Sequence, residues 1–470
     1  MTLIDTRTEP ITSIAPFAEL DASTTGTVAV PGDDAYDALV SPWNLAIPVR
    51  PAAVLAARTA QDVVEAVRFA ARHDMRVTPQ ATGHGPMAEL VTELLVTTQG
   101  LDECVVHPEG WARVGAGVKW LRVVEAAAPH GLAPLSGSIT DVGIVGYTTG
   151  GGLGPMARTY GLAIDKVRAI EVVTGDGELR RATPTEHPEL FFSLRGAKGM
   201  LGIVTAIEFD LVHQPTFYGG SLWFDGDDAA TVIERWLHWS EALPELATTS
   251  IALFQLPAMP GVPPELADRL TLSVRYVWTG DPEEGERRFA QIRGAAPVLV
   301  DDVALKPYTA IDSVHTDPLD PTPAYEAAAV LTDFPAQAVD ALLSLTGPGS
   351  GSPQVLVEVR QMGGATARAG EHESAFCSRG AAYSLLIVGI ADVPGVEAHA
   401  EEVLEALDPW TSGHRLPNFT FSPEEYVDAY DELTLARLRR AIRTYDPLGV
   451  MAIGQVLFTS PGGQAMKIPA

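Results

Sequence analysis

Six glycines fall within twelve residues of this chain, in the segment from Gly143 to Gly154, which reads Gly-Ile-Val-Gly-Tyr-Thr-Thr-Gly-Gly-Gly-Leu-Gly. A glycine has no Cβ, so backbone built from several of them can turn sharply and approach another group closely. Successive amides in such turns can converge on one anion, for example the pyrophosphate of a nucleotide cofactor. The segment therefore predicts a backbone cradle for a phosphate-bearing cofactor.

Part of this segment, Gly152 to Ala157, also satisfies the GxGxxG/A spacing of dinucleotide-binding folds, with Glu171 and Asp176 at about the distance of a ribose partner. That fingerprint normally follows a strand and begins a helix. Here glycines and threonines precede it, Pro155 interrupts it, and the hairpin signal Asp-Gly at residues 176–177 follows it. The context argues against a Rossmann site.

A second turn of small residues spans Gln80 to Gly85 and follows a strand predicted at Met75 to Thr78. Its backbone could form another cradle, and its one reactive side chain is His84. A histidine beside a cofactor can be a base, a ligand or a covalent anchor, and a loop histidine is often only hydrogen-bonded. No second ligand stands at metal-binding spacing, so no metal site is predicted.

The charge balance narrows the possible partners. The chain has 470 residues with 32 Lys+Arg against 60 Asp+Glu, a net charge of −28. Such a surface repels phosphate backbones and anionic lipids, so we predict a small-molecule substrate and no nucleic-acid or membrane partner.

Cys104 and Cys377 are too few for a disulfide framework, and no signal peptide or spanning segment is visible, which predicts a cytoplasmic protein. The oligomeric state is not indicated.

The order of predicted elements indicates an α+β fold. Residues 1–30 are polar and without period, which predicts a weakly ordered lead-in. Residues 31–215 alternate short strands with helices, one of which starts at the capping pattern Thr59-Ala-Gln-Asp62. Residues 216–412 have longer alternating strands separated by helices, which predicts an antiparallel sheet backed by helices.

One strand of that sheet has a polar side. Leu356, Glu358 and Arg360 alternate with three valines between Val355 and Val359, so the sheet is expected to have one polar and one core face. The polar face either lines a substrate site or is exposed to solvent. Glu358 beside Arg360 could be an exposed ion pair that contributes little to stability.

Taken together, the two glycine-containing segments resemble the flavin-linked oxidases of the berberine bridge enzyme family, within the vanillyl-alcohol oxidase and p-cresol methylhydroxylase (PCMH) superfamily. The resemblance covers nearly the whole chain, through ordered matches at Tyr36-Asp37, Trp43-Asn44, residues 61–70, the Thr-Gly-His turn, residues 150–165, 171–177, 186–196 and 202–205, Leu416-Pro-Asn418 and Tyr445-Asp-Pro447. It implies a PCMH-type FAD-binding domain made of residues 31–215 and 413–470, with residues 216–412 inserted as a substrate domain.

The resemblance also implies which residues contact the cofactor. It joins His84 covalently to the flavin 8α-methyl, and it implies further FAD-binding residues: Gln80, Ala81, Thr82, Gly83, Gly85, Thr140, Gly143, Gly146, Tyr147, Gly150, Gly151, Gly152, Gly154, Gly202, Val204 and Asn418. Many relatives bond a cysteine to the flavin as well, but Ile139 stands at that position here. The expected cofactor is FAD with a single histidyl bond.

The activity implied is oxidation of a small alcohol, amine or similar C–H donor by hydride transfer to the flavin. Oxygen would reoxidise the flavin and give hydrogen peroxide, in specialised metabolism. The family tyrosine that serves as base is replaced by Leu416, so Tyr147, Tyr383 and Glu358 are the candidates for that role. Two alternatives stay open: a redox-neutral cyclisation or rearrangement on the same flavin, and a non-catalytic binding protein.

Overall fold

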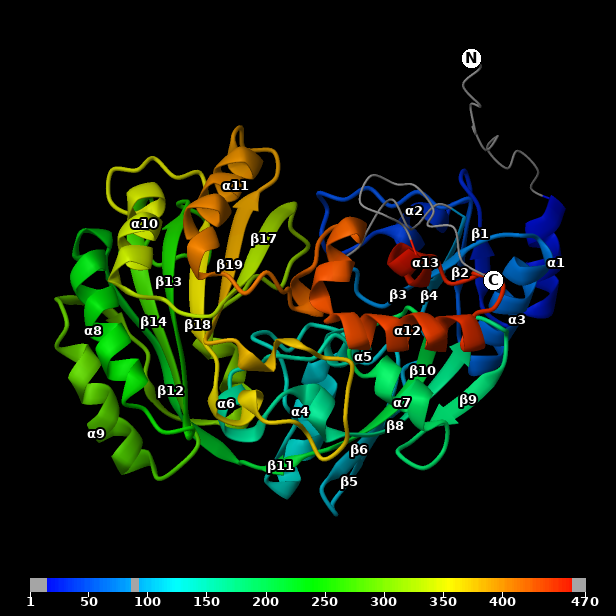
Figure 1. Ribbon diagram of the computed structural model, residues 1–470, viewed down its shortest axis with the longest axis horizontal. Coiled ribbons are helices and arrows are strands. Elements are labelled where there is room, and N and C mark those ends of the chain that lie inside the picture. The colour runs from blue at the N-terminus through cyan, green and yellow to red at the C-terminus, as the bar shows by residue number, and fades with distance from the viewer. Residues whose placement is uncertain (1–14, 86–92, 459–470) are drawn as a thin grey trace.

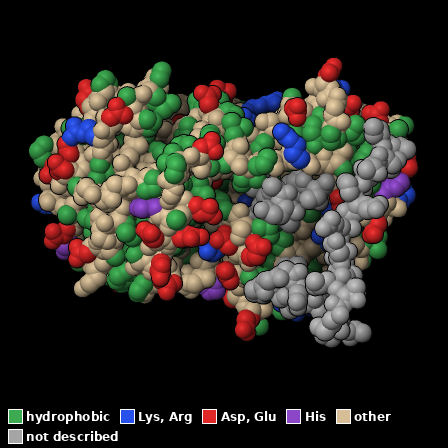
Figure 2. All heavy atoms as spheres, turned by 90° about the horizontal axis from the view of Figure 1, so that it is seen from above, with side chains coloured by type: hydrophobic (Ala, Val, Ile, Leu, Met, Phe, Trp, Pro, Cys, Tyr) green, Lys and Arg blue, Asp and Glu red, His purple; other side chains and the backbone are tan. Residues whose placement is uncertain are grey.

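The computed structural model describes residues 15–85 and 93–458 of the chain. Two lobes of mixed helix and sheet lie side by side, which confirms the α+β prediction (Figure 1). Seen from above, acidic side chains are spread over both lobes and basic ones are few, as the net charge of −28 requires (Figure 2). Within the described ranges, no helix combines the length and apolarity that crossing a bilayer demands.

The first lobe contains a four-stranded sheet in the order β1 (Thr27–Ala29), β2 (Ala53–Ala56), β4 (Leu94–Thr97) and β3 (Val77–Gln80). Helix α3 (Ala60–Arg72) packs against it through one apolar side. The helix begins at the predicted capping box, in which Thr59 Oγ1 accepts from the Asp62 amide and the Asp62 carboxylate accepts from the Thr59 amide.

The predicted weakly ordered lead-in over residues 1–30 is wrong from residue 15 onward. Helix α1 (Ala15–Ser23) packs Phe17 and Leu20 into the core around α3, and β1 pairs with β2. Over residues 17–23, whose burial is described, the helix buries only these two apolar side chains, so the sequence shows no repeating apolar pattern there. Residues 1–14 lie outside the described residues.

A second sheet in the same lobe is antiparallel. Its order is β5 (Cys104–His107), β6 (Trp111–Gly115), β10 (Gly202–Asp210), β8 (Val167–Thr174) and β9 (Leu179–Ala182). The predicted hairpin joins β8 to β9, and Gly177 there has a φ of +77°.

The C-terminal part of the described chain packs in the same core as this sheet. Helix α12 (Glu432–Tyr445) contacts α7 (Pro188–Leu194), and its Leu438 and Ile442 lie in that core. The short helix α13 (Ala452–Gln455) contacts β3. This packing is what a domain built from both ends of the chain requires, and the limits 31–215, 216–412 and 413–470 remain predictions.

The second lobe is built on one antiparallel sheet, as predicted. Its order is β15 (Val298–Asp301), β12 (Thr216–Asp225), β14 (Arg269–Trp278), β13 (Ala247–Leu256), β18 (Leu356–Gln361), β19 (Tyr383–Ile390) and β17 (Ala324–Leu331), and β16 (Ala304–Pro307) also pairs with β12. Four helices cover the face turned away from the first lobe (Figure 1): α8 (Ala229–Glu241), α9 (Pro282–Arg293), α10 (Ala336–Thr346) and α11 (Val396–Leu407).

The two faces of this sheet differ as the alternation in β18 predicts. Val357 and Val359 pack in the core with the helices, whereas Glu358 and Arg360 lie on the opposite face. That face is not solvated, because the first lobe covers it: Arg360 reaches the Leu153 carbonyl, and Glu358 and Arg360 are 2% and 6% exposed. The interpretation as an exposed ion pair is therefore wrong.

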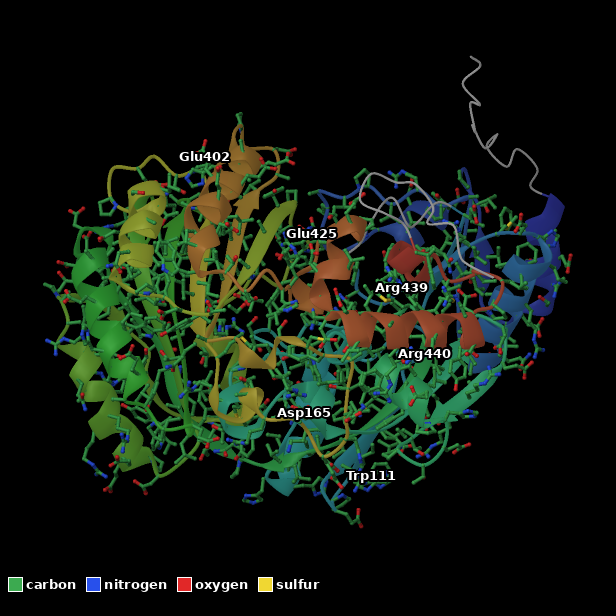
Figure 3. All side chains as sticks on the ribbon, viewed as in Figure 1. Trp111, Asp165, Glu402, Glu425, Arg439 and Arg440 are labelled. Carbon is green, nitrogen blue, oxygen red and sulfur yellow. The ribbon has the colours of Figure 1, made fainter. Side chains whose placement is uncertain are left out.

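Charged side chains join the lobes at several points. Asp165 lies at the junction (Figure 3) and binds Arg379 at 2.5 Å. Arg158, on α6 (Ala157–Tyr160), donates from Nε to the Ala247 carbonyl of β13 at 2.8 Å. The sheet face and the first lobe thus form one continuous buried interface.

Candidate cofactor and active site

The turn after β3 has its carbonyls anchored and its amides free. The carbonyls of Thr82 and Gly83 accept from the amides of Trp43 and Asn44 at 3.0 and 3.1 Å. Within the described residues, the five amides of residues 81–85 donate no hydrogen bond. Gly83 has a φ of +72°, and a Cβ there would lie 2.7 Å from Pro42, so only glycine fits. The amides are left available to an anion, as the sequence predicts.

A second set of free amides adjoins this turn. A Cβ on Gly143 would lie 3.4 Å from Ala81 Cβ and 3.6 Å from the Thr82 side chain, so the two loops touch. The Val142 carbonyl accepts from the Trp120 amide at 3.1 Å, while the amides of residues 141–143 donate to nothing in the described chain. Both loops can therefore contribute amides to one phosphate-bearing ligand.

His84 is held on two sides. Its Nδ1 lies 2.8 Å from Thr82 Oγ1, and its ring stacks on Trp43 with centroids 4.5 Å apart and planes at 10°. Burial lowers the pKa of His84 to about 4, Lys119 adds to this, and Asp141 opposes it. The imidazole is therefore neutral at neutral pH and keeps the lone pair that a nucleophile needs.

Residues 43–45, here called the connecting segment, join this turn to the second lobe. Trp43 Nε1 donates to the Leu319 carbonyl at 3.1 Å. Asn44 donates from Nδ2 to the Ala324 carbonyl at 2.9 Å and accepts at Oδ1 from the Ala324 amide at 3.1 Å. The position of His84 is thereby fixed relative to β17.

Glu326 follows Ala324 on β17 and was not predicted as a site residue. Strand register places it on the same sheet face as Glu358, toward the first lobe. Its carboxylate makes no hydrogen bond or ion pair in the described chain. Burial raises the pKa of Glu326 to about 7, Asp317 raises it further, and Lys198 opposes the rise.

Lys198 is a second partly buried charged group at this junction. Its Nζ makes one long contact, 3.4 Å, with the Pro417 carbonyl, and burial lowers its pKa to about 8. The only sequence signal for Glu326 is a lone acid within an alanine-rich strand, and Lys198 has none. Burial at the lobe junction, which no local pattern reveals, gives both residues their shifted pKa values.

Most glycines of residues 143–154 allow close protein contacts. A Cβ would lie 2.0 Å from Asn418 Oδ1 at Gly150, 2.7 Å from Phe376 at Gly151, 2.6 Å from Ala163 at Gly152 and 2.1 Å from the Ser136 carbonyl at Gly154. By contrast, Gly146 and Gly85 have nothing within 4 Å and leave open space for a ligand. A helix, α5 (Ile144–Thr149), precedes Gly152 in place of the strand that a dinucleotide fingerprint requires, so a Rossmann site is not formed here.

Several other predicted cofactor residues bind protein groups. Thr140 donates its amide and hydroxyl to Asp312 at 2.9 and 2.5 Å. Gln80 Nε2 contacts the Val40 carbonyl, and Asn418 Nδ2 donates to the Tyr147 carbonyl. Gly202 and Val204 are paired within β10. Their contacts with FAD remain predictions.

Neither predicted tyrosine is placed to act as a base. The Tyr147 hydroxyl donates to the Ser136 carbonyl at 3.2 Å, and burial raises the pKa of Tyr147 well above its ordinary value. Tyr383 pairs with Gln361 in register and packs in the core beneath the helices, near Trp236. It therefore lies on the sheet face opposite the first lobe.

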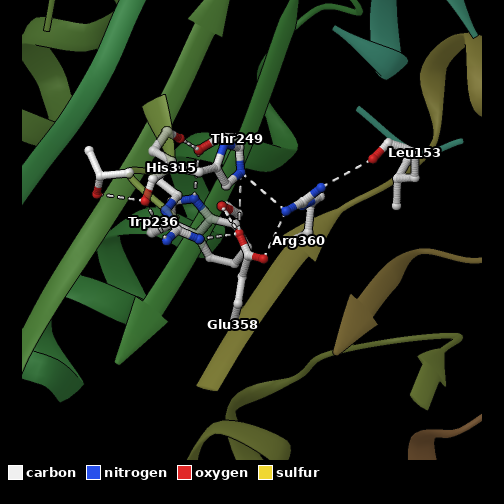
Figure 4. A network of polar contacts seen from close by, with 9 residues as sticks. Leu153, Trp236, Thr249, His315, Glu358 and Arg360 are labelled. Carbon is white, nitrogen blue, oxygen red and sulfur yellow. Dashed lines mark hydrogen bonds and ion pairs between the residues drawn. The ribbon is translucent and has the colours of Figure 1, made fainter. Parts of the chain in front are cut away.

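Glu358 is also unsuited to accept a proton. It receives hydrogen bonds from Ser250, Arg275 and Arg360 at 2.6, 2.7 and 2.9 Å (Figure 4). Burial opposes ionisation, yet Arg360 and Arg275 hold the pKa of Glu358 well below its usual value. A carboxylate so stabilised in its charged form is a weak base.

Comparison with known families agrees with the geometry of the two loops. Residues 51–183 match the family described as FAD binding domain. This part of the chain is therefore similar to FAD binding domains. It contains His84 and both loops with free amides, so the cradles predicted from glycine content lie inside the matched region.

Relatives of the chain include flavin enzymes. (R)-6-Hydroxynicotine oxidase of Paenarthrobacter nicotinovorans is 26% identical over 62% of this chain and 63% of its own length. The FAD-linked oxidoreductase sorD of Penicillium rubens is 32% identical over 46% of this chain and 47% of its own length. The chain thus spans less than two thirds of either relative.

Solved structures share the fold beyond the FAD binding domain. A crystal structure of 6-hydroxy-D-nicotine oxidase from Arthrobacter nicotinovorans superposes with a TM-score of 0.78 at 23% identity, over 91% of this chain and 97% of that one. Glucooligosaccharide oxidase from Acremonium strictum gives 0.79 at 17% identity, over 93% and 97%. The two-lobed fold is therefore that of known flavin oxidases, as the resemblance implies.

Proposed function

We propose that the protein is an FAD-dependent oxidase of a small organic molecule and that His84 alone holds its flavin covalently. The observation that carries the proposal is the neutral imidazole of His84, which Thr82 holds by a hydrogen bond. It lies in the turn 81–85, whose five amides make no hydrogen bond in the described chain. When bound, the flavin supplies a hydride acceptor that oxygen can reoxidise, with hydrogen peroxide as product. The free amides of residues 81–85 and 141–143 would bind the phosphates.

A single bond is proposed because no cysteine stands near the expected second position. The glucooligosaccharide oxidase of the same fold is described with a 6-S-cysteinyl, 8α-N1-histidyl FAD. In this chain Ile139 takes the cysteine's place in the resemblance. Cys377 Sγ lies between the Ala375 carbonyl and the Asp431 amide, and Cys104 lies in β5.

Glu326 is proposed as the group that accepts the substrate proton. A general base works best when its pKa lies near the operating pH, and burial brings that of Glu326 to about 7. Its carboxylate has no partner in the described chain, so it is free to receive a substrate hydroxyl or amine. The connecting segment holds its strand beside the His84 turn, through Asn44 and Ala324.

The covalent bond can be tested without a known substrate. Purified wild-type protein, denatured and separated by electrophoresis, should retain flavin fluorescence in its band, and His84→Ala should not. His107→Ala, which removes a histidine stacked on Trp111 in the second sheet, is the matched control and should keep the flavin. Fluorescence in the His84→Ala band would refute the attachment.

Oxidase activity is tested by the fate of the reduced flavin. Protein reduced anaerobically with dithionite and then mixed with air should reoxidise rapidly and release about one hydrogen peroxide per flavin, as measured with a peroxidase-coupled dye. A reduced flavin that persists in air would contradict the oxidase proposal. No observation specifically favours the redox-neutral or the non-catalytic alternative.

A further inference from the structure

A row of polar side chains crosses the sheet face that the first lobe covers. Strand register pairs Ser250 of β13 with Arg275 of β14 on one side and with Arg360 of β18 on the other. Arg360 in turn pairs with Ser384 of β19. Two guanidinium groups therefore flank one hydroxyl on three adjacent strands, and Arg275 and Arg360 are only 2% and 6% exposed.

The positive charges in this row exceed the negative charge within reach. Glu358 is the one carboxylate of the described chain that forms an ion pair with either arginine, at 2.7 Å to Arg275 and 2.9 Å to Arg360. Asp317 raises the pKa of Arg360 but lies beyond ion-pair distance. Burial lowers the pKa of the adjoining His315 to about 4, so it is neutral. One positive charge is left without a partner, which is unfavourable in a buried site.

Two buried donors in the same cluster lack an acceptor. Arg360 Nη2 lies 3.1 Å from His315 Nε2. A guanidinium can only donate, so Nε2 accepts and the imidazole proton resides on Nδ1. His315 Nδ1 and Arg275 Nε are both buried, and neither has a hydrogen-bond partner in the described chain. The cluster thus has an unpaired charge and two unpaired N–H groups.

A small pocket adjoins these groups. A pocket of about 10 Å³, the space of about one water-sized group, is lined by Arg275, Arg360, His315 and Ser250 on the sheet side and by Pro155 of the first lobe. Arg360 also donates to the carbonyl of Leu153, within residues 143–154, so the pocket lies between that segment and the sheet (Figure 4). A ligand there would touch both lobes.

We propose that this pocket binds a carboxylate and that the carboxylate belongs to the molecule the enzyme oxidises. A carboxylate supplies the missing negative charge, and its two oxygens can accept from an arginine N–H and an imidazole N–H together. A water molecule could accept the same hydrogen bonds but would leave the charge uncompensated. The assignment to the oxidised substrate rests on the proposed function, whereas carboxylate binding by the cluster does not.

The binding is tested on the wild-type protein with acetate as the probe. Thermal unfolding is followed by tryptophan fluorescence in HEPES buffer at constant ionic strength, with acetate, acetamide or chloride added. Acetate should raise the unfolding temperature with saturation, and acetamide, which lacks the charge, should not. Equal effects of acetate and acetamide, or of acetate and chloride, would overturn the proposal of a carboxylate site.

A variant locates the effect at the cluster. Arg360→Gln leaves Glu358 paired with Arg275 and Ser250 while removing the excess charge. Its half-saturating acetate concentration should rise at least about 30-fold, the effect of about 2 kcal/mol expected when a buried charge contact is lost. Arg368→Gln removes the same charge from an exposed pair with Glu245 and should bind acetate like wild type. Unchanged acetate binding in Arg360→Gln would refute the site. If that variant does not fold, the comparison of acetate with acetamide and chloride on the wild-type protein decides whether the site exists.

Failure of this proposal can be told apart from failure of the proposed function. The acetate effect is read from protein unfolding, and it should persist in His84→Ala, which lacks the flavin bond. A chain that retains flavin and releases peroxide but shows no acetate effect would overturn only the carboxylate site. A wild-type chain that holds no flavin or releases no peroxide, but keeps the acetate effect, would overturn the proposed function and with it the placement of the carboxylate on an oxidised substrate, while the carboxylate site would stand.

Discussion

Glu326 and Lys198 are partly buried at the lobe junction, and burial shifts their pKa values toward each other. The pKa of Glu326 rises to about 7, and that of Lys198 falls to about 8. Both groups therefore change charge close to neutral pH, which is typical of residues that transfer protons. A carboxylate on an open surface would remain ionised throughout this range and would be a weaker base.

Substitution of Glu326 should remove the base without removing the cofactor. Glu326→Gln should slow anaerobic flavin reduction by substrate roughly 10²- to 10⁴-fold, the usual contribution of a general base. In wild type the same rate should fall as pH drops below about 7, because protonated Glu326 cannot accept a proton. Glu425→Gln, at a junction carboxylate paired with Arg415 (Figure 3), should keep both rate and pH profile. An unchanged pH profile in Glu326→Gln would exclude this role.

The same pKa shift predicts a pH-dependent stability. The pKa of Glu326 rises from 4.5 to about 7 on folding, so the unfolded chain releases a proton between these values that the folded protein keeps. The free energy of unfolding should therefore fall as pH rises through that window. Glu326→Gln should then be more stable than wild type at pH 8, by roughly 1–3 kcal/mol in urea unfolding, and nearly equal to it at pH 5. A destabilised variant at pH 8 would contradict the assignment.

Among the elements, the turn at residues 81–85 and helix α5 organise the cofactor side of the site. The turn could be predicted from the sequence, because small residues around His84 directly follow a predicted strand. The helix could not, since Gly146 lies within its six residues and Gly143 and Gly150 flank it. A Cβ on Gly150, Gly151 or Gly154 would meet Asn418, Phe376 or Ser136, contacts that local sequence does not encode, and the contacts of these glycines with FAD remain predictions.

Two glycine substitutions separate packing from cofactor contact. Gly150→Ala places a methyl 2.0 Å from Asn418 Oδ1, which should break the hydrogen bond from Asn418 to the Tyr147 carbonyl and destabilise the protein by roughly 1–3 kcal/mol. Gly146→Ala, with nothing within 4 Å, should cause no loss of stability. Urea unfolding of both variants checks this. Equal stability of the two would show that Gly150 is not needed for packing.

At the scale of the whole molecule, the two lobes meet at the polar face of the sheet, which the first lobe covers. The alternation in β18 predicted that face, and strand patterns predicted the antiparallel sheet. What covers the face could not be predicted, because Arg275 and Glu358 meet across 83 residues of sequence and His315 reaches them from a third segment. The residues that bind one another across the lobes thus carry no local signal.

Asn44 should matter for the relative position of the lobes. Asn44→Ala removes both hydrogen bonds to Ala324 from a residue that is 2% exposed, and it should lower the free energy of unfolding by roughly 1–3 kcal/mol. Loosened lobes should also slow flavin reduction by substrate. Gln61→Ala removes an exposed amide paired with Glu65 and should change neither quantity. Wild-type stability and rate in Asn44→Ala would show that the connecting segment does not hold the lobes.

The most direct test of the account is a peptide mass map of the purified protein. The proteolytic peptide that contains His84 should carry the added mass of one FAD, and fragmentation should place it on the imidazole. Peptides that contain Cys104 or Cys377 should be unmodified. Flavin released on denaturation, or found on any residue other than His84, would contradict the single histidyl attachment.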